Sequence, residues 1–108
     1  MGITIETEDK TLIAHLSGDI DHHSAAALRE QIDSSAERIA PALLRLDFAN
    51  VGFMDSSGIG LIMGRYRLMC ALGGRLTVGG LSPALERMVH LAGLERLAIW
   101  ETKGGETV

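Results

Sequence analysis

Six consecutive residues, Asp-Ser-Ser-Gly-Ile-Gly from Asp55 to Gly60, form the densest group of potentially reactive side chains in the sequence. A carboxylate beside two hydroxyls, Ser56 and Ser57, could belong to a nucleophilic site, and the nearby glycines could let a phosphate approach the backbone. The same residues could also cap a helix or accept a covalent modification. Their spacing separates these possibilities.

The spacing argues against an enzyme or a dedicated nucleotide site. Gly58, Gly60 and Gly64 do not follow the G-x-G-x-x-G dinucleotide fingerprint, and no carboxylate occurs in the next strand segment. A P-loop would need Gly-Lys-Ser/Thr, and a serine hydrolase elbow would need glycine where Met54 or Asp55 stands. We therefore expect no catalysis and no required cofactor, with weak nucleotide or small-molecule binding as the remaining alternative.

Two interpretations of the cluster stay open. Asp55, Ser56 or Ser57 could serve only as the N-cap, which accepts hydrogen bonds from the first free N–H groups of a helix. Alternatively, the cluster could be a binding surface that another protein regulates by phosphorylating a serine. A phosphate would add about −1.5 to −2 charge beside Asp55 and so weaken docking there. The glycines would leave room for the active site of the kinase.

The elements that must position the cluster alternate between strands and helices. Strand patterns lie near residues 3–5, 12–16, 44–48, 76–78 and 97–99, and helical patterns near 24–40, 57–72 and 83–92. The order β-β-α-β-α-β-α-β predicts one α/β domain over residues 1–108, with a small mixed, mostly parallel sheet. The cluster then lies where a strand meets a helix, the usual place for a site in open α/β sheets. Residues 103–108 are expected to form a frayed tail.

Composition excludes several classes of protein. The chain has 108 residues, 46% of them hydrophobic and 22% charged, as in a soluble globular domain. The net charge of −4 and the scattered lysines and arginines argue against direct nucleic-acid binding. A single cysteine and the absence of a leader or a long apolar run indicate a cytoplasmic protein without membrane contact. His22 and His23 are expected to be solvated loop residues rather than metal ligands.

The helix predicted after the cluster carries two apolar stripes. At about 100° per residue, one side is expected to face the core: Ile59, Ile62, Met63, Tyr66, Met69 and Cys70. Leu61 and Arg65, together with Leu68 and Leu72, fall on nearly the opposite side. Either neighbouring helices cover this second stripe, or it forms an exposed contact for a partner.

Three separated segments resemble the anti-sigma factor antagonists of the STAS domain family. They are Leu-Ser-Gly-Asp-Ile-Asp-His-His-Ser-Ala from Leu16, Phe-Met-Asp-Ser-Ser-Gly-Ile-Gly-Leu-Ile-Met-Gly-Arg-Tyr-Arg from Phe53, and Leu-Ser-Pro-Ala-Leu-Glu-Arg-Met from Leu81. The resemblance covers nearly the whole chain. Asp-His-His and Gly-Arg-Tyr make the sequence most similar to the sporulation branch of the family, with the stress-response branch as the alternative.

This resemblance implies a switch in which the chain itself is not an enzyme. Unmodified family members bind an anti-sigma factor, which is also a serine kinase, and thereby release the sigma factor. The kinase phosphorylates the first serine of Asp-Ser-Ser, here Ser56, which dissociates the complex, and a serine phosphatase restores the active form. Partner contacts are implied at Asp21 and His22 on the adjacent loop. The other expected contacts flank Ser56 or follow it on the helix: Asp55, Ser57, Gly58, Gly60, Leu61 and Arg65.

Overall fold

The computed structural model describes residues 2–101, which form a four-stranded sheet and three helices. The elements are β1 (Gly2–Glu8), β2 (Thr11–Ile20), α1 (His22–Ile39), β3 (Leu43–Met54), α2 (Ser56–Ala71), β4 (Arg75–Gly79), α3 (Pro83–Leu91) and a 3₁₀ turn (Leu94–Arg96). The strand order is β1-β2-β3-β4, in which β1 is antiparallel to β2 and the other neighbours are parallel. The predicted α/β fold and mixed sheet are confirmed, while the predicted tail at 103–108 lies outside the described residues.

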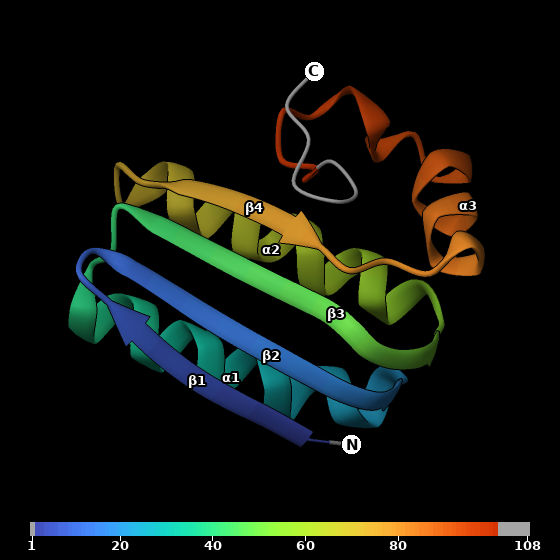
Figure 1. The fold of residues 1–108 in the computed structure, drawn as a ribbon, viewed down its shortest axis with the longest axis horizontal. Helices are drawn as coiled ribbons and strands as arrows, with labels where there is room; N and C mark the ends of the chain where they lie inside the picture. The colour runs from blue at the N-terminus through green and yellow to red at the C-terminus, as the bar shows by residue number, and fades with distance from the viewer. Residues whose placement is uncertain (1, 102–108) are drawn as a thin grey trace.

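The sheet and two helices form two layers. Figure 1 shows α1 and α2 behind one face of the sheet, with α3 beyond the end of β4. Alternate residues of β2 and β3 point toward the helices and are buried, because side chains along a strand alternate between its two faces. These buried strand residues are Leu12, Ala14, Leu16, Leu44, Leu46 and Phe48. They meet Leu28 and Ile32 of α1 and Ile62 and Met69 of α2 in one core.

The strand predicted at 97–99 is the one element that the structure does not form. Within the described part of the chain, this segment contributes a single parallel bridge between Val78 and Trp100. Ile99 is nevertheless buried, and its carbonyl accepts a 2.7 Å hydrogen bond from the Val78 N–H. The 3₁₀ turn takes up the preceding residues, and Trp100 Nε1 donates a 3.0 Å hydrogen bond to the Leu94 carbonyl. The segment is held by these contacts instead of by a strand ladder.

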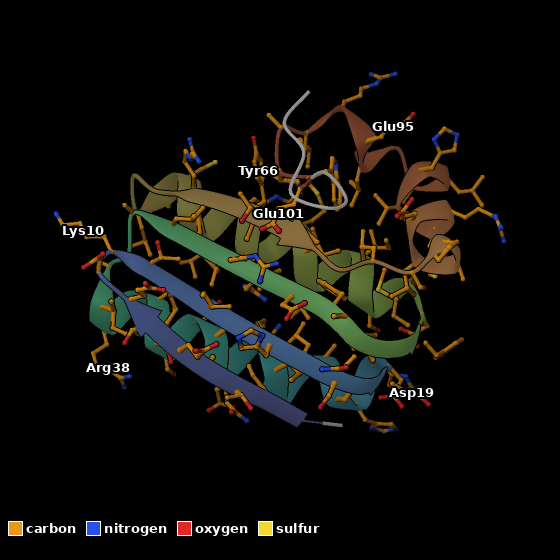
Figure 2. All side chains as sticks on the ribbon, viewed as in Figure 1. Lys10, Asp19, Arg38, Tyr66, Glu95 and Glu101 are labelled. Atoms are coloured by element: carbon orange, nitrogen blue, oxygen red, sulfur yellow. The ribbon has the colours of Figure 1, made fainter. Side chains whose placement is uncertain are left out.

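The sheet face turned away from α1 and α2 is polar. Glu101, labelled in Figure 2, forms a two-pronged ion pair there with Arg45 of β3, at 2.7 and 2.9 Å. His15 of β2 lies between two carboxylates: its Nδ1 is 2.6 Å from Asp47 Oδ2, and its Nε2 contacts Glu6 Oε1. The hydrogen bonds to Asp47 and then to Glu6 raise the pKa of His15 above 6.5.

The histidine contact predicts a specific pH dependence of stability. Because the folded pKa of His15 is raised, its contribution is fully present below pH 6.5 and is lost as the pH rises through the folded value. We expect His15→Asn to lower the free energy of unfolding by about 0.5–1 kcal/mol at pH 5.5 and by less at pH 8.5, since the pair is partly exposed. Urea unfolding at both pH values measures this. An equal loss at the two pH values would contradict the prediction.

Candidate functional site at the carboxyl ends of β2 and β3

Asp55 and Ser56 mark the point at which β3 gives way to α2. Asp55 is the N-cap of α2, and its Oδ1 accepts a 2.8 Å hydrogen bond from the Ser57 N–H. This confirms the capping interpretation for the aspartate. Ser56 is the first residue of the helix and its side chain is exposed, so it is not the residue that caps the helix. Its hydroxyl is therefore left on the surface at the positive end of a helix dipole.

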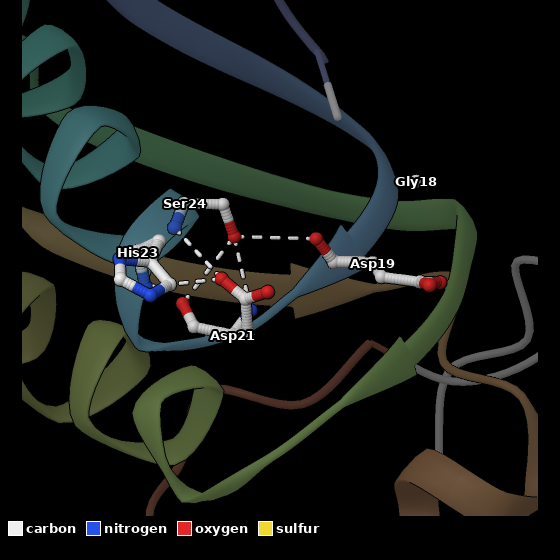
Figure 3. Close-up of a pocket in the computed structure, with 5 residues that line it drawn as sticks. All are labelled: Gly18, Asp19, Asp21, His23 and Ser24. Carbon is white, nitrogen blue, oxygen red and sulfur yellow. Dashed lines mark hydrogen bonds between the residues drawn. The ribbon is translucent and has the colours of Figure 1, made fainter.

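Asp21 has the corresponding position at the start of α1. Its Oδ1 accepts hydrogen bonds from the N–H groups of His23 and Ser24, at 3.0 and 2.9 Å, while Ser24 Oγ accepts one from the Asp21 N–H. Figure 3 shows this reciprocal capping box. The hydrogen bond from the Ser24 backbone lowers the pKa of Asp21, so the carboxylate is ionised at neutral pH. His22 and His23, expected as loop residues, are instead the first two residues of α1, and both are exposed.

The two helix starts lie together at one edge of the sheet. β2 and β3 are parallel neighbours that end in register, with Ile20 opposite Met54, and the Asp55 N–H donates a 3.0 Å hydrogen bond to the Ile20 carbonyl. We call residues 19–23 and 52–57 the carboxyl-end rim. The rim brings Asp21 and His22 beside Asp55, Ser56 and Ser57, residues that are more than thirty positions apart in the sequence.

The two glycines near Ser56 have different structural roles. Gly58 is buried, and a Cβ on it would lie 2.5 Å from Sδ and 2.9 Å from Cβ of Met54. Its missing side chain therefore lets the start of α2 pack on the end of β3, while Gly58 as a partner contact stays a prediction. Gly60 is exposed, and a Cβ there would meet nothing within 4 Å. Of the two, Gly60 alone leaves the surface bare beside Ser56.

Alanine substitutions are expected to separate the two roles. Gly58→Ala forces Met54 to move and should destabilise the fold by about 1–3 kcal/mol, the usual cost of overpacking. Gly60→Ala and Gly64→Ala meet no obstruction and should each stabilise α2 by about 0.5–1 kcal/mol, because alanine loses less backbone entropy than glycine in a helix. Chemical denaturation of the three variants tests this. A Gly58→Ala variant as stable as the wild type would show that the packing with Met54 is loose.

Leu61 and Arg65 lie on the second stripe, which either a neighbouring helix or a partner was expected to cover, and both are buried. Their exposed fractions are 3% and 5%, and Arg65 Nε lies 2.7 Å from Oδ1 of Asp33 on α1. The helix packs against α1 as well as against the sheet, so the neighbouring helix covers this stripe. The structure thus supports the first alternative, cover by the neighbouring helix, and contact of either residue with a partner stays a prediction. The predicted core face of the helix is wrong at one edge, because Cys70, expected to face the core, is exposed.

Three features of this region were not predicted from the sequence. Ser24 completes the capping box, and its position three residues after Asp21 was a usable signal. Asp33 balances the buried Arg65, but nothing in the sequence indicates which helix faces which. Phe53 stands exposed at the end of β3, although apolar strand residues usually face the core.

A shallow hollow lies beside α1 in the rim. It is lined by Gly18, Asp19, Asp21, His23 and Ser24 (Figure 3). The rings of His22 and His23 lie 4.2 Å apart.

Within residues 2–101, no group of three or more histidine, cysteine or acidic side chains is placed to hold a metal ion. In the same range, no helix has the length and apolarity to cross a membrane.

The fold and rim define a small α/β domain with an exposed serine at one helix start, next to the aspartate-capped start of another. The chain belongs to the STAS domain family, because the sequence model of that family matches residues 2–105. It is 37% identical to the anti-sigma F factor antagonist of Paenibacillus polymyxa, over 90% of this chain and 85% of the relative. It is 30% identical to the anti-sigma-B factor antagonist of Bacillus subtilis strain 168, over 88% and 85%. The solved structure of the Bacillus cell fate determinant SpoIIAA in the phosphorylated form covers 94% of this chain and 93% of its own, with 29% identity and a TM-score of 0.73.

Proposed function

We propose that this protein is a phosphorylation-controlled anti-sigma factor antagonist. Its unmodified form binds an anti-sigma factor serine kinase, which then releases a sigma factor. Phosphorylation of Ser56 ends the complex, and a serine phosphatase restores the binding form. The observation that carries this proposal is the exposed hydroxyl of Ser56 at the first position of α2, with the adjacent Asp55 already engaged as the cap. The names of the similar proteins support the same function.

The position of Ser56 suits a phosphate that changes binding without unfolding the protein. At a helix N-terminus, free N–H groups and the helix dipole favour an anion. Outward from the helix, the phosphate adds about −1.5 to −2 charge to a rim that already holds Asp21 and Asp55. A partner docked on this rim meets new negative charge at its closest approach, so the complex is destabilised while the fold is kept.

Phosphate mapping tests the assignment. We expect incubation with ATP and the anti-sigma factor kinase from the same genome to place one phosphate on Ser56, located by mass spectrometry of tryptic peptides. Ser57→Ala is the matched control and should still be phosphorylated, whereas Ser56→Ala should not. Phosphate on Ser57 alone would overturn the site, and no binding or transfer with this kinase would overturn the function.

Asp21 and His22 are proposed as partner contacts at the neighbouring start of α1. Because Asp21 also caps α1, its replacement by alanine would confuse binding with stability. Asparagine caps nearly as well as aspartate, so Asp21→Asn removes the charge and keeps the helix start. We expect Asp21→Asn to melt like the wild type and to bind the kinase more weakly in calorimetry. Equal binding would exclude the Asp21 charge from the interface.

We further propose that the switch belongs to sporulation and acts in the cytoplasm, where sigma factors meet RNA polymerase. The greater identity to the anti-sigma F relative than to the anti-sigma-B relative favours the sporulation branch over a stress-response antagonist. Deleting the gene separates the two, because loss of sporulation supports the first and loss of stress survival alone supports the second.

A further inference from the structure

Phe53 is a large aromatic side chain left exposed on the rim. Its exposed fraction is 55%, and it lies three residues before Ser56. Leu72 and Leu91 are the other large exposed apolar side chains among the described residues. Leu72 lies just past the opposite end of α2, and Leu91 ends α3. Phe53 is thus the one of the three that adjoins the phosphorylation site.

A bulge in β3 turns Phe53 outward. Opposite the step from Gly18 to Asp19 in β2, β3 advances by two residues, from Val51 to Phe53, so Gly52 is extra. Val51 is buried, and regular alternation would return Phe53 to the same buried face. With the extra residue, Phe53 pairs with exposed Asp19, and Met54 takes the buried position instead. Bulges near functional sites commonly re-aim a side chain in this way.

The surroundings of Phe53 fit a protein partner. Its neighbour Gly52 is exposed and carries no side chain, so it leaves the ring approachable. Asp19, opposite in the sheet, is also exposed and borders the hollow at the start of α1; Figure 3 shows its side chain directed away from the capping box. An exposed aromatic ring with a polar, charged border is the arrangement of an interface anchor and its rim.

We propose that Phe53 is an apolar anchor that inserts into an apolar pocket of the anti-sigma factor kinase and positions Ser56 for phosphorylation. This inference rests on the proposed function, because its occupant is the kinase that modifies Ser56. Phe53 and Asp55 both lie within three residues of Ser56 on the rim, so a partner whose active site reaches the serine docks beside the ring. Phe53 is a positioning residue in this scheme and has no part in the transfer of the phosphate itself.

The test compares Phe53→Ala with Leu72→Ala, which removes an exposed apolar side chain at the far end of α2. Both variants should melt within error of the wild type, since neither side chain belongs to the core. With the same kinase, we expect Phe53→Ala to raise Kd by roughly tenfold or more, as for an anchor that becomes fully buried. Leu72→Ala should leave Kd unchanged. In phosphorylation assays Phe53→Ala should raise KM and leave kcat near the wild-type value, and Phe53→Leu should recover part of the affinity.

The outcomes distinguish this inference from the function beneath it. If the wild type binds the kinase and is phosphorylated on Ser56 while Phe53→Ala behaves identically, the anchor is excluded and the switch stands. If the wild type neither binds nor is phosphorylated, the proposed function itself fails. Equal weakening by Phe53→Ala and Leu72→Ala would show a general effect of surface truncation and would also overturn the anchor.

Discussion

Ser56→Asp is expected to fold like the wild type and to bind the anti-sigma factor kinase on the order of 100-fold more weakly, because like charges facing across an interface cost several kcal/mol. The carboxylate occupies the first position of α2, where a helix N-terminus favours negative charge. The fold should therefore lose nothing, and the melting temperature should stay equal or rise slightly. Isothermal calorimetry gives the change in Kd, and circular dichroism gives the stability.

A neutral substitution separates charge from shape in this experiment. Ser56→Asn has nearly the size of Ser56→Asp without its charge, and neither variant can be phosphorylated. We expect the asparagine variant to bind much more tightly than the aspartate variant, and the gap between them to shrink as salt screens the repulsion. If both variants lose binding equally at all salt concentrations, steric exclusion rather than charge breaks the complex.

Asp33→Ala is expected to lower the free energy of unfolding by about 2–3 kcal/mol, because it leaves the buried Arg65 guanidinium without a counter-ion. Arg65 is 5% exposed, whereas the Asp33 side chain retains 25%. Burial lowers the pKa of Arg65 and raises the pKa of Asp33, so for both groups the lost hydration outweighs the mutual attraction. Urea unfolding at pH 7 measures the loss.

The opposite substitution should cost less. Arg65→Met keeps the apolar part of the side chain against α1 and leaves a carboxylate that still reaches water, so we expect a loss of about 1 kcal/mol. Combining Asp33→Ala with Arg65→Met should recover most of the stability that Asp33→Ala loses alone, since no uncompensated buried charge remains. Additive losses in the double variant would show that the pair does not join the two helices energetically.

The ends of the helices and the core face of the central strand could be predicted from the residue types nearby. Asp55 acts as the N-cap of α2, which was one of the predicted interpretations of the Asp-Ser-Ser segment. The alternation of Leu44, Leu46 and Phe48 marked the central strand correctly. Local hydrogen bonding and side-chain periodicity determine these features, and both are visible within a few residues of sequence.

Errors arose where a residue's surroundings depend on distant parts of the chain. Leu97 and Ile99 alternate like a strand, but in the folded chain they follow a 3₁₀ turn and contribute to a single bridge. The sequence shows that Leu61 and Arg65 share one stripe of the helix. Only the contact with α1 in the folded chain buries that stripe. Periodicity reports a face of a helix but not what covers that face.

The sequence by itself determined the order of the strands and helices through α3, the N-cap of α2, the Asp-Ser-Ser segment and the family resemblance, because each depends on residues close together in the chain. The tertiary structure decided which of these residues share a surface. Parallel pairing of β2 with β3 brings Asp21 to Ser56, packing on Met54 explains Gly58, and a bulge opposite Gly18 exposes Phe53. Strand register and helix contacts join segments that are far apart in the chain, so a local pattern cannot specify them.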